Sequence, residues 1–113
     1  MSAITTHILD ISTGVPARGV PVVLERQTEN GWEVIGEGET DDDGRLKELL
    51  KPDMTLLTGN YRLTFDTGFY FFDRQIDSFY PYVTVAFTVF DSREHYHVPL
   101  LLSPFGYSTY RGS

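Results

Sequence analysis

The chain has 113 residues, of which 16 are acidic and 9 are basic, so that its formal net charge is −7, and it contains no cysteine. Without cysteine it can form neither a disulfide framework nor a thiolate metal site, and an acidic balance without a basic tract argues against nucleic-acid binding. No apolar run approaches the roughly 20 residues that a membrane-spanning helix requires. We therefore expect a single globular domain over residues 1–113, and a cytoplasmic location because its first residues do not resemble a secretory signal.

Alternation with a period of two dominates the chain. Tyr61, Leu63 and Phe65, for example, alternate with Arg62 and Thr64, a pattern typical of strands that have two different faces. Segments rich in Gly, Pro, Asn and Asp separate these runs and supply turns. The predicted strands lie near residues 3–11, 19–27, 32–40, 45–49, 60–67, 82–91, 94–103 and 106–111. Eight short strands with regular turns favour an all-β sandwich or a small barrel.

The segment from Phe69 to Phe79 does not follow this alternation. Phe72, Ile76 and Phe79 recur at helical spacing, which predicts one short helix here. No internal repeat, linker or low-complexity tract interrupts the rest of the pattern.

Three histidines are the first candidates for chemistry. His95 and His97 lie two residues apart on one predicted strand, so that both side chains point to the same face. A single histidine in such a place is more often a partly exposed strand residue, or one satisfied by a neighbour, than a catalytic group. With His7 as a third imidazole, the pair could instead form a catalytic zinc site with an open position, although the sequence offers no clear carboxylate partner.

The alternation also predicts which way these side chains point. On strand 94–103, Tyr96, Val98, Leu100 and Leu102 form the more apolar face, which is the expected core face. His97 is then expected to point outward, where only a partner subunit could enclose it.

Arg45 and the C-terminal tail are further candidates. Arg45 follows the acidic turn 41–44, which could be a solvated hairpin with a neutralising arginine, or could aim the planar guanidinium at a carbonyl oxygen or an anion. Chain ends are usually polar and frayed, yet aromatic residues continue here to Tyr110. The tail is therefore expected to pack on the sheet or to line a binding site.

The run from His95 to Ser113, which ends in Tyr-Arg-Gly-Ser, closely resembles the end of the 5-hydroxyisourate hydrolases, the transthyretin-related enzymes of urate breakdown. Segments 6–10, 40–45 and 61–68 match the same family, so that the resemblance covers essentially the whole chain. Transthyretin, a hormone carrier of the same fold, shares the Leu-Leu-Ser-Pro stretch but lacks the equivalent histidines, the arginine and the terminal Tyr-Arg-Gly-Ser.

The resemblance implies a transthyretin-like β-sandwich of two four-stranded antiparallel sheets with one short helix. It implies a homotetramer with active sites at the dimer–dimer interface, and hydrolysis of 5-hydroxyisourate to 2-oxo-4-hydroxy-4-carboxy-5-ureidoimidazoline, on the way from urate to allantoin, without metal or cofactor. The positions that match catalytic residues are His7, Arg45 and His97. The positions that match substrate-binding residues are His7, Arg45, Tyr110, Arg111, Gly112 and Ser113. His95 fits the family pattern but receives no chemical role from it.

The residue types suit this chemistry. A neutral imidazole can take a proton from the attacking water, and Arg45 can stabilise the negative charge of a tetrahedral intermediate. Which histidine activates water, and which orients it or protonates the departing nitrogen, stays open. The alternatives are a transthyretin-like carrier of small aromatic ligands without catalysis, since fold does not fix function, and a zinc hydrolase.

Overall fold

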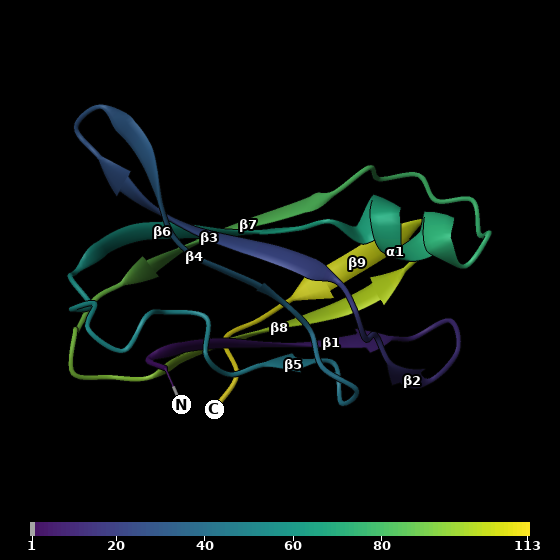
Figure 1. The fold of residues 1–113 in the computed structure, drawn as a ribbon, viewed down its shortest axis with the longest axis horizontal. Helices are drawn as coiled ribbons and strands as arrows, with labels where there is room; N and C mark the ends of the chain where they lie inside the picture. The colour runs from purple at the N-terminus through teal and green to yellow at the C-terminus, as the bar shows by residue number, and fades with distance from the viewer. Residues whose placement is uncertain (1) are drawn as a thin grey trace.

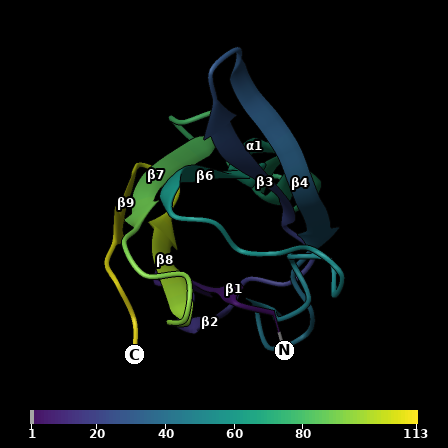
Figure 2. The same cartoon turned by 90° about the vertical axis from the view of Figure 1, so that its left-hand side faces the viewer.

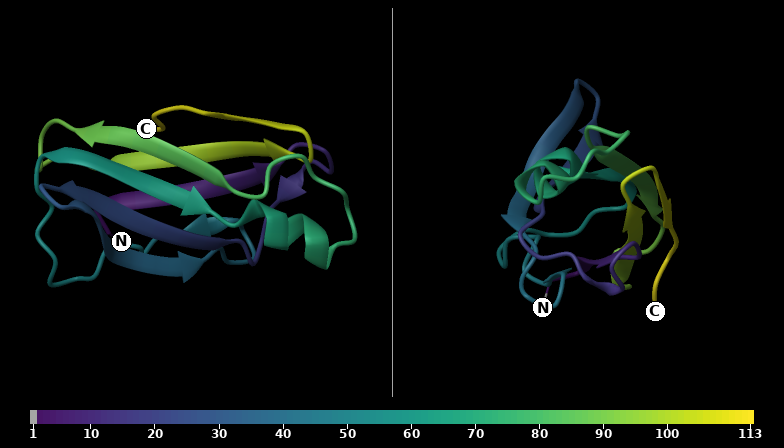
Figure 3. Two further views of the ribbon diagram at one scale, coloured as in Figure 1. Left: turned by 90° about the horizontal axis from the view of Figure 1, so that it is seen from above. Right: turned by 90° about the vertical axis from the view of Figure 1, so that its right-hand side faces the viewer.

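A computed structural model describes residues 2–113 as two β-sheets packed face to face, with one short helix at one end of the sandwich (Figure 1, Figure 3). The first sheet has the order β2-β1-β8-β9, with β5 also paired to β1, and the second has the order β4-β3-β6-β7. The elements are β1 (Ile4–Asp10), β2 (Val15–Pro16), β3 (Pro21–Thr28), β4 (Gly31–Glu39), β5 (Arg45–Leu46), β6 (Gly59–Phe65), α1 (Thr67–Asp73), β7 (Val83–Val89), β8 (Tyr96–Ser103) and β9 (Gly106–Thr109). Within residues 2–113, no helix is long and apolar enough to cross a membrane.

The sandwich of two sheets with one short helix is confirmed, but the first sheet differs in detail from two four-stranded antiparallel sheets. The first sheet has five strands, because β2 and β5 both pair with β1. The strand predicted at 45–49 is shorter in the structure, where β5 covers only Arg45–Leu46. The central pair, β1 and β8, runs parallel. Parallel strands need a long crossover connection, and the whole second sheet supplies it here, since β3, β4, β6 and β7 lie between β1 and β8 in the sequence.

The core lies between the sheets (Figure 2) and is built from the faces that the period-two pattern predicts. On β8, the four residues of the predicted core face are at most 6% exposed: Tyr96, Val98, Leu100 and Leu102. Burial of such apolar area contributes roughly 25 cal/mol per Å². His97 is partly exposed on the opposite face, as the alternation predicts.

Helix α1 begins and ends earlier than the predicted segment 69–79, and the spacing used to predict it was misleading. The carboxylate of Asp66 accepts a backbone N–H of the first turn, which starts the helix at Thr67. The chain leaves helical geometry by Gln75, whose φ is 59°. Phe72, part of the predicted apolar stripe, is 81% exposed. The buried residues of the helix are Thr67, Tyr70 and Phe71.

A buried carboxylate joins the end of β1 to this helix. Asp10 is 1% exposed and accepts hydrogen bonds from the hydroxyl of Tyr70 at 2.8 Å and from the backbone N–H of Ser12 at 3.0 Å. Burial, together with the hydrogen bond to Asp10, raises the pKa of Tyr70 to about 12. The hydroxyl therefore remains a donor throughout the neutral range, and the contact fixes the helix on the sandwich.

Replacing Tyr70 by Phe should lower the free energy of unfolding by about 1–3 kcal/mol, because the buried carboxylate of Asp10 loses the hydrogen bond from the Tyr70 hydroxyl. Urea unfolding measures the change. Tyr82→Phe is the matched control, since Tyr82 is exposed and loses no such contact. Equal stability of the two variants would contradict a stabilising role for the Asp10–Tyr70 bond.

Candidate active site

Strands β1, β5 and β8 bring residues from three parts of the sequence side by side. His7 of β1 lies opposite Arg45 of β5. In the parallel pair of β1 and β8, Thr5 lies opposite His97. Because residues two apart on a strand share a face, Thr5 and His7 lie on the face of the sheet from which His97 projects.

The acidic turn before β5 positions Arg45. The carboxylate of Asp41 accepts the backbone N–H groups of Asp43 and Arg45 at 2.9 and 3.0 Å. Gly44 has a φ of 72°, and a Cβ at this position would lie 2.5 Å from the carbonyl oxygen of Ile8. The turn is thus closely packed against β1, and it presents Arg45 next to His7.

His97 is held from two sides. Its Nδ1 lies 2.8 Å from Oγ1 of Thr5. On the other side, the C-terminal tail returns from β9 along β8 (Figure 2), and the backbone N–H of Gly112 donates to the carbonyl oxygen of His97 at 2.8 Å. A Cβ on Gly112 would lie 2.6 Å from Cδ2 of His97. The tail can approach the ring this closely because residue 112 is glycine.

Arg111 anchors the tail through contacts on the flank of β8. Its guanidinium lies 4.5 Å from the centre of the Tyr96 ring and 3.6 Å from the carboxylate of Glu94, and it donates to the carbonyl oxygen of His95 at 3.4 Å. These contacts use the side chain for packing. The expectation that the tail packs on the sheet is confirmed.

A hollow of about 150 Å³ opens where these strands meet the tail. Its lining residues are Thr5, Thr6, Arg45, Lys47, His95, His97 and Ser113. Three of the predicted site residues, Arg45, His97 and Ser113, therefore line one hollow. His7 lies beside it, opposite Arg45, but is not part of its lining.

Tyr110 and Arg111 line a different surface from the hollow. They border a mainly apolar groove of about 260 Å³, between β7 and the tail, which His97 also lines. In the single chain, Tyr110 is 57% exposed. The structure thus places His97 at the border of two concave surfaces, with Arg45 on one and Tyr110 on the other.

Three residues of the hollow were missed by sequence reasoning: Thr5, Thr6 and Lys47. Lys47 lies two residues after Arg45, so the rule that alternate residues share a face could have identified it as a second cation. Thr5 stands two residues before His7, but its importance depends on the pairing of β1 with β8, which no local pattern reveals.

Both histidines near Arg45 are biased towards the neutral form. Partial burial, followed by the nearby Arg45 guanidinium, lowers the pKa of His97, and the His7 and His95 rings add to this effect. Partial burial and Arg45 also lower the pKa of His7, opposed by a hydrogen bond to the backbone of Asp43 and by the charges of Asp41 and Asp43. Near neutral pH both rings can therefore accept a proton.

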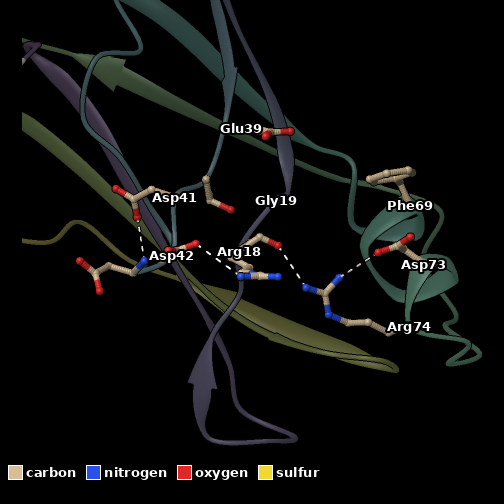
Figure 4. A pocket seen from close by; sticks show the side chains of 10 residues that line it. Arg18, Gly19, Glu39, Asp41, Asp42, Phe69, Asp73 and Arg74 are labelled. Carbon is tan, nitrogen blue, oxygen red and sulfur yellow. Dashed lines mark hydrogen bonds and ion pairs between the residues drawn. The ribbon is translucent and has the colours of Figure 1, made fainter.

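A larger cavity lies elsewhere. It measures about 740 Å³ and is bordered by the acidic turn and the helix (Figure 4). In it Arg18 pairs with Asp42 at 3.6 Å, and Arg74 donates to the carbonyl oxygen of Arg18 at 3.3 Å. None of the predicted site residues lines this cavity, so its size does not locate the chemistry.

The zinc alternative finds no ligand set in the part of the chain that the structure describes. No group of three or more His, Cys, Asp or Glu side chains within residues 2–113 is arranged to hold a metal ion. The three-histidine site considered from the sequence is therefore not formed in this structure.

Comparison with known proteins identifies close relatives. The model of the HIUase/Transthyretin family matches residues 4–112. The 5-hydroxyisourate hydrolase of Salmonella dublin is 52% identical over 110 residues, which cover 97% of this chain and 80% of that protein. The solved 5-hydroxyisourate hydrolase of Klebsiella pneumoniae is 39% identical with a TM-score of 0.85, covering 97% and 98% of the two chains. Sea bream transthyretin in complex with thyroxine is 32% identical with a TM-score of 0.91, covering 98% and 95%.

Proposed function

This chain belongs to the HIUase/transthyretin family, and we propose that it is a 5-hydroxyisourate hydrolase of urate degradation. The reaction opens the six-membered ring of 5-hydroxyisourate with water and yields 2-oxo-4-hydroxy-4-carboxy-5-ureidoimidazoline. The observation that carries this proposal is that Arg45 and His97 face one small hollow, with His7 beside Arg45.

The carrier alternative is not favoured. The fold cannot separate a carrier from an enzyme, because both hydrolases and transthyretin share it. The side chains do separate them. Two imidazoles with lowered pKa values beside a guanidinium supply a base and an anion stabiliser, which hydrolysis needs and passive binding of an aromatic ligand does not.

The proposed reaction breaks the bond between N1 and C6 of the substrate. Water adds to the C6 carbonyl carbon and gives up a proton to a neutral imidazole. Arg45 donates hydrogen bonds to the oxygen on which negative charge develops. The intermediate then expels N1, which takes a proton. Lys47, on the same hollow, supplies a second positive charge for the substrate oxygens.

We further propose that the active unit is a homotetramer with sites at the dimer–dimer interface. In a single chain Tyr110 is 57% exposed, and it lines the apolar groove that shares His97 with the hollow. Both β7 and β9 are edge strands, whose free backbone groups can pair with a second copy. Sedimentation should give the mass of four chains, and dilution into monomers should abolish activity. A fully active monomer would overturn this part of the proposal.

Activity should depend on pH in a direction that the histidine environments determine. We expect kcat/KM to fall on acidification with a midpoint below 6.5, because the pKa values of His7 and His97 are lowered and each ring stays neutral until the pH drops further. Between the folded and the unfolded pKa the unfolded chain binds more protons, so stability also declines with acidification through this range. A pH–rate profile corrected for spontaneous decay measures the midpoint, and a value above 6.5 would contradict this interpretation.

Isotopically labelled water tests the reaction type. Hydrolysis of freshly made substrate in heavy-oxygen water should place one labelled oxygen in the new carboxyl group of the product, at a rate proportional to the amount of protein. A carrier would bind the compound and leave both the rate and the product unchanged from those of the protein-free solution.

A further inference from the structure

A buried threonine lies between two imidazole rings at the wall of the hollow. Thr5 is 4% exposed and lies opposite His97 in the pair of β1 and β8. Its Oγ1 lies 2.8 Å from Nδ1 of His97 and 3.5 Å from Nε2 of His95. The first distance is that of a good hydrogen bond, and the second lies at the outer limit. The chemistry described so far does not use this hydroxyl.

The direction of the shorter hydrogen bond decides what His97 can do. A neutral imidazole has one N–H and one free nitrogen lone pair, and a hydroxyl can donate once and also accept. If Thr5 accepts from Nδ1–H, the Nε2 lone pair of His97 remains free to take a proton. If Thr5 donates instead, Nε2 carries the hydrogen and His97 cannot serve as a base at that atom.

Two features favour the first arrangement. The imidazolium form of His97 still donates from Nδ1, so the ring can gain a proton on Nε2 without any movement of Thr5. The hydroxyl hydrogen of Thr5 is then free to point towards Nε2 of His95. In the opposite arrangement the hydroxyl would have to rotate each time the ring is protonated.

We propose that Thr5 is a positioning residue that accepts a hydrogen bond from Nδ1–H of His97 and so fixes the tautomer in which Nε2 takes the proton of the attacking water. This inference rests on the proposed function, and it assigns the role of base to His97. In the step, a water O–H bond breaks, its proton goes to Nε2, and the oxygen bonds to the carbonyl carbon. The imidazolium returns the proton to the departing nitrogen as the C–N bond breaks, and the new carboxyl group releases its own proton to solvent.

The positive charges around His97 disfavour its protonated form, and a hydrogen-bond acceptor at Nδ1 stabilises that form. Besides partial burial, which is the largest cause, the pKa of His97 is lowered by Arg45 of β5, His7 of β1 and the neighbouring His95. Lys47 lines the same hollow. The hydroxyl oxygen of Thr5 partly offsets this lowering of the pKa, because it accepts a hydrogen bond from the positively charged ring of His97. Loss of the hydroxyl should therefore lower the pKa of His97 further.

Thr5→Val removes the hydroxyl and keeps the shape of the side chain. We expect kcat to fall at least tenfold while KM stays within twofold, and the acid limb of the pH profile to move to lower pH. Thr5→Ser should recover most of kcat. Tyr70→Phe is the matched control, because it also loses a buried hydroxyl contact to β1, at the opposite end of the strand, and should keep the kcat of the wild type. An unchanged kcat in Thr5→Val, or a loss that Ser does not recover, would overturn the proposal.

The ring nitrogens of His97 give a readout that needs no substrate. Nitrogen-15 NMR of the unliganded wild-type protein, above the pKa of His97, should show Nδ1 protonated and Nε2 bare. The opposite tautomer would overturn the role of Thr5 even if the protein is an active hydrolase. Wild-type protein that leaves 5-hydroxyisourate to decay at its spontaneous rate would instead refute the proposed function, whatever the tautomer.

Discussion

Replacing His97 by Asn is expected to lower kcat by about 10²–10⁴-fold, the range that a positioned general base contributes. The asparagine side chain is polar and of similar reach, so it can still meet Thr5, but it cannot take a proton from water. Steady-state kinetics on freshly made 5-hydroxyisourate, corrected for spontaneous decay, measure the effect.

The fold should survive this change. His97 is partly exposed and faces away from the core, and its carbonyl oxygen accepts the tail N–H through the backbone, which Asn retains. The unfolding temperature of His97→Asn should therefore lie within a few degrees of that of the wild type. Its oligomeric mass should be the same within error. Near-normal turnover in a well-folded variant would show that His97 is not the base.

Adding a single methyl group to the tail, at Gly112, should cause the second-largest loss of kcat. Gly112→Ala places a Cβ 2.6 Å from Cδ2 of His97 and 3.1 Å from Cγ of Pro99, so the tail or the ring must shift by several tenths of an ångström or more. Because a displacement of about 1 Å in a catalytic group can cost roughly 10²-fold in rate, we expect kcat to fall about 10–100-fold.

Gly106→Ala is the matched control for this prediction. Its Cβ would meet only Oγ of Ser103, at an ordinary contact distance of 3.8 Å, at the start of the same C-terminal segment. We expect it to retain wild-type kcat. If both alanine variants are equally active, or equally impaired, close packing of the tail on His97 is not what the reaction requires.

The sequence predicted the sandwich because its strands have one apolar face each. The alternation in β8 identified the buried side from Tyr96 to Leu102 and the outward position of His97, since a strand that buries one face has a strongly determined register. The helix was less well predicted. Its position follows from the Asp66 cap and from the packing of Tyr70 and Phe71, whereas the apolar residues that suggested it are partly solvent-exposed.

The candidate site was only partly predictable, because it depends on pairings between distant segments. Arg45 was identified from its own turn, and His97 from its strand. Thr5 gains its contact to His97 only because β1 runs parallel to β8, a pairing that the expected antiparallel sheets excluded. One sequence does not show which surfaces of two chains meet, so the tetramer stays a prediction. The cytoplasmic location also stays a prediction.

The net charge of the chain bears on how an anionic substrate reaches the site. A field from a net charge of −7 repels an anionic substrate over the whole molecule. Attraction of such a substrate must therefore be local, and we propose that Arg45 and Lys47, which line one hollow, provide it.

The most direct test of the enzyme assignment is the absorbance decay of freshly prepared 5-hydroxyisourate, followed side by side with wild-type protein, with His97→Asn and without protein. The enzyme assignment predicts a decay with wild type that is much faster than the spontaneous reaction and proportional to protein concentration, and a decay with His97→Asn close to the spontaneous rate. A wild-type decay equal to that of the protein-free solution would contradict it.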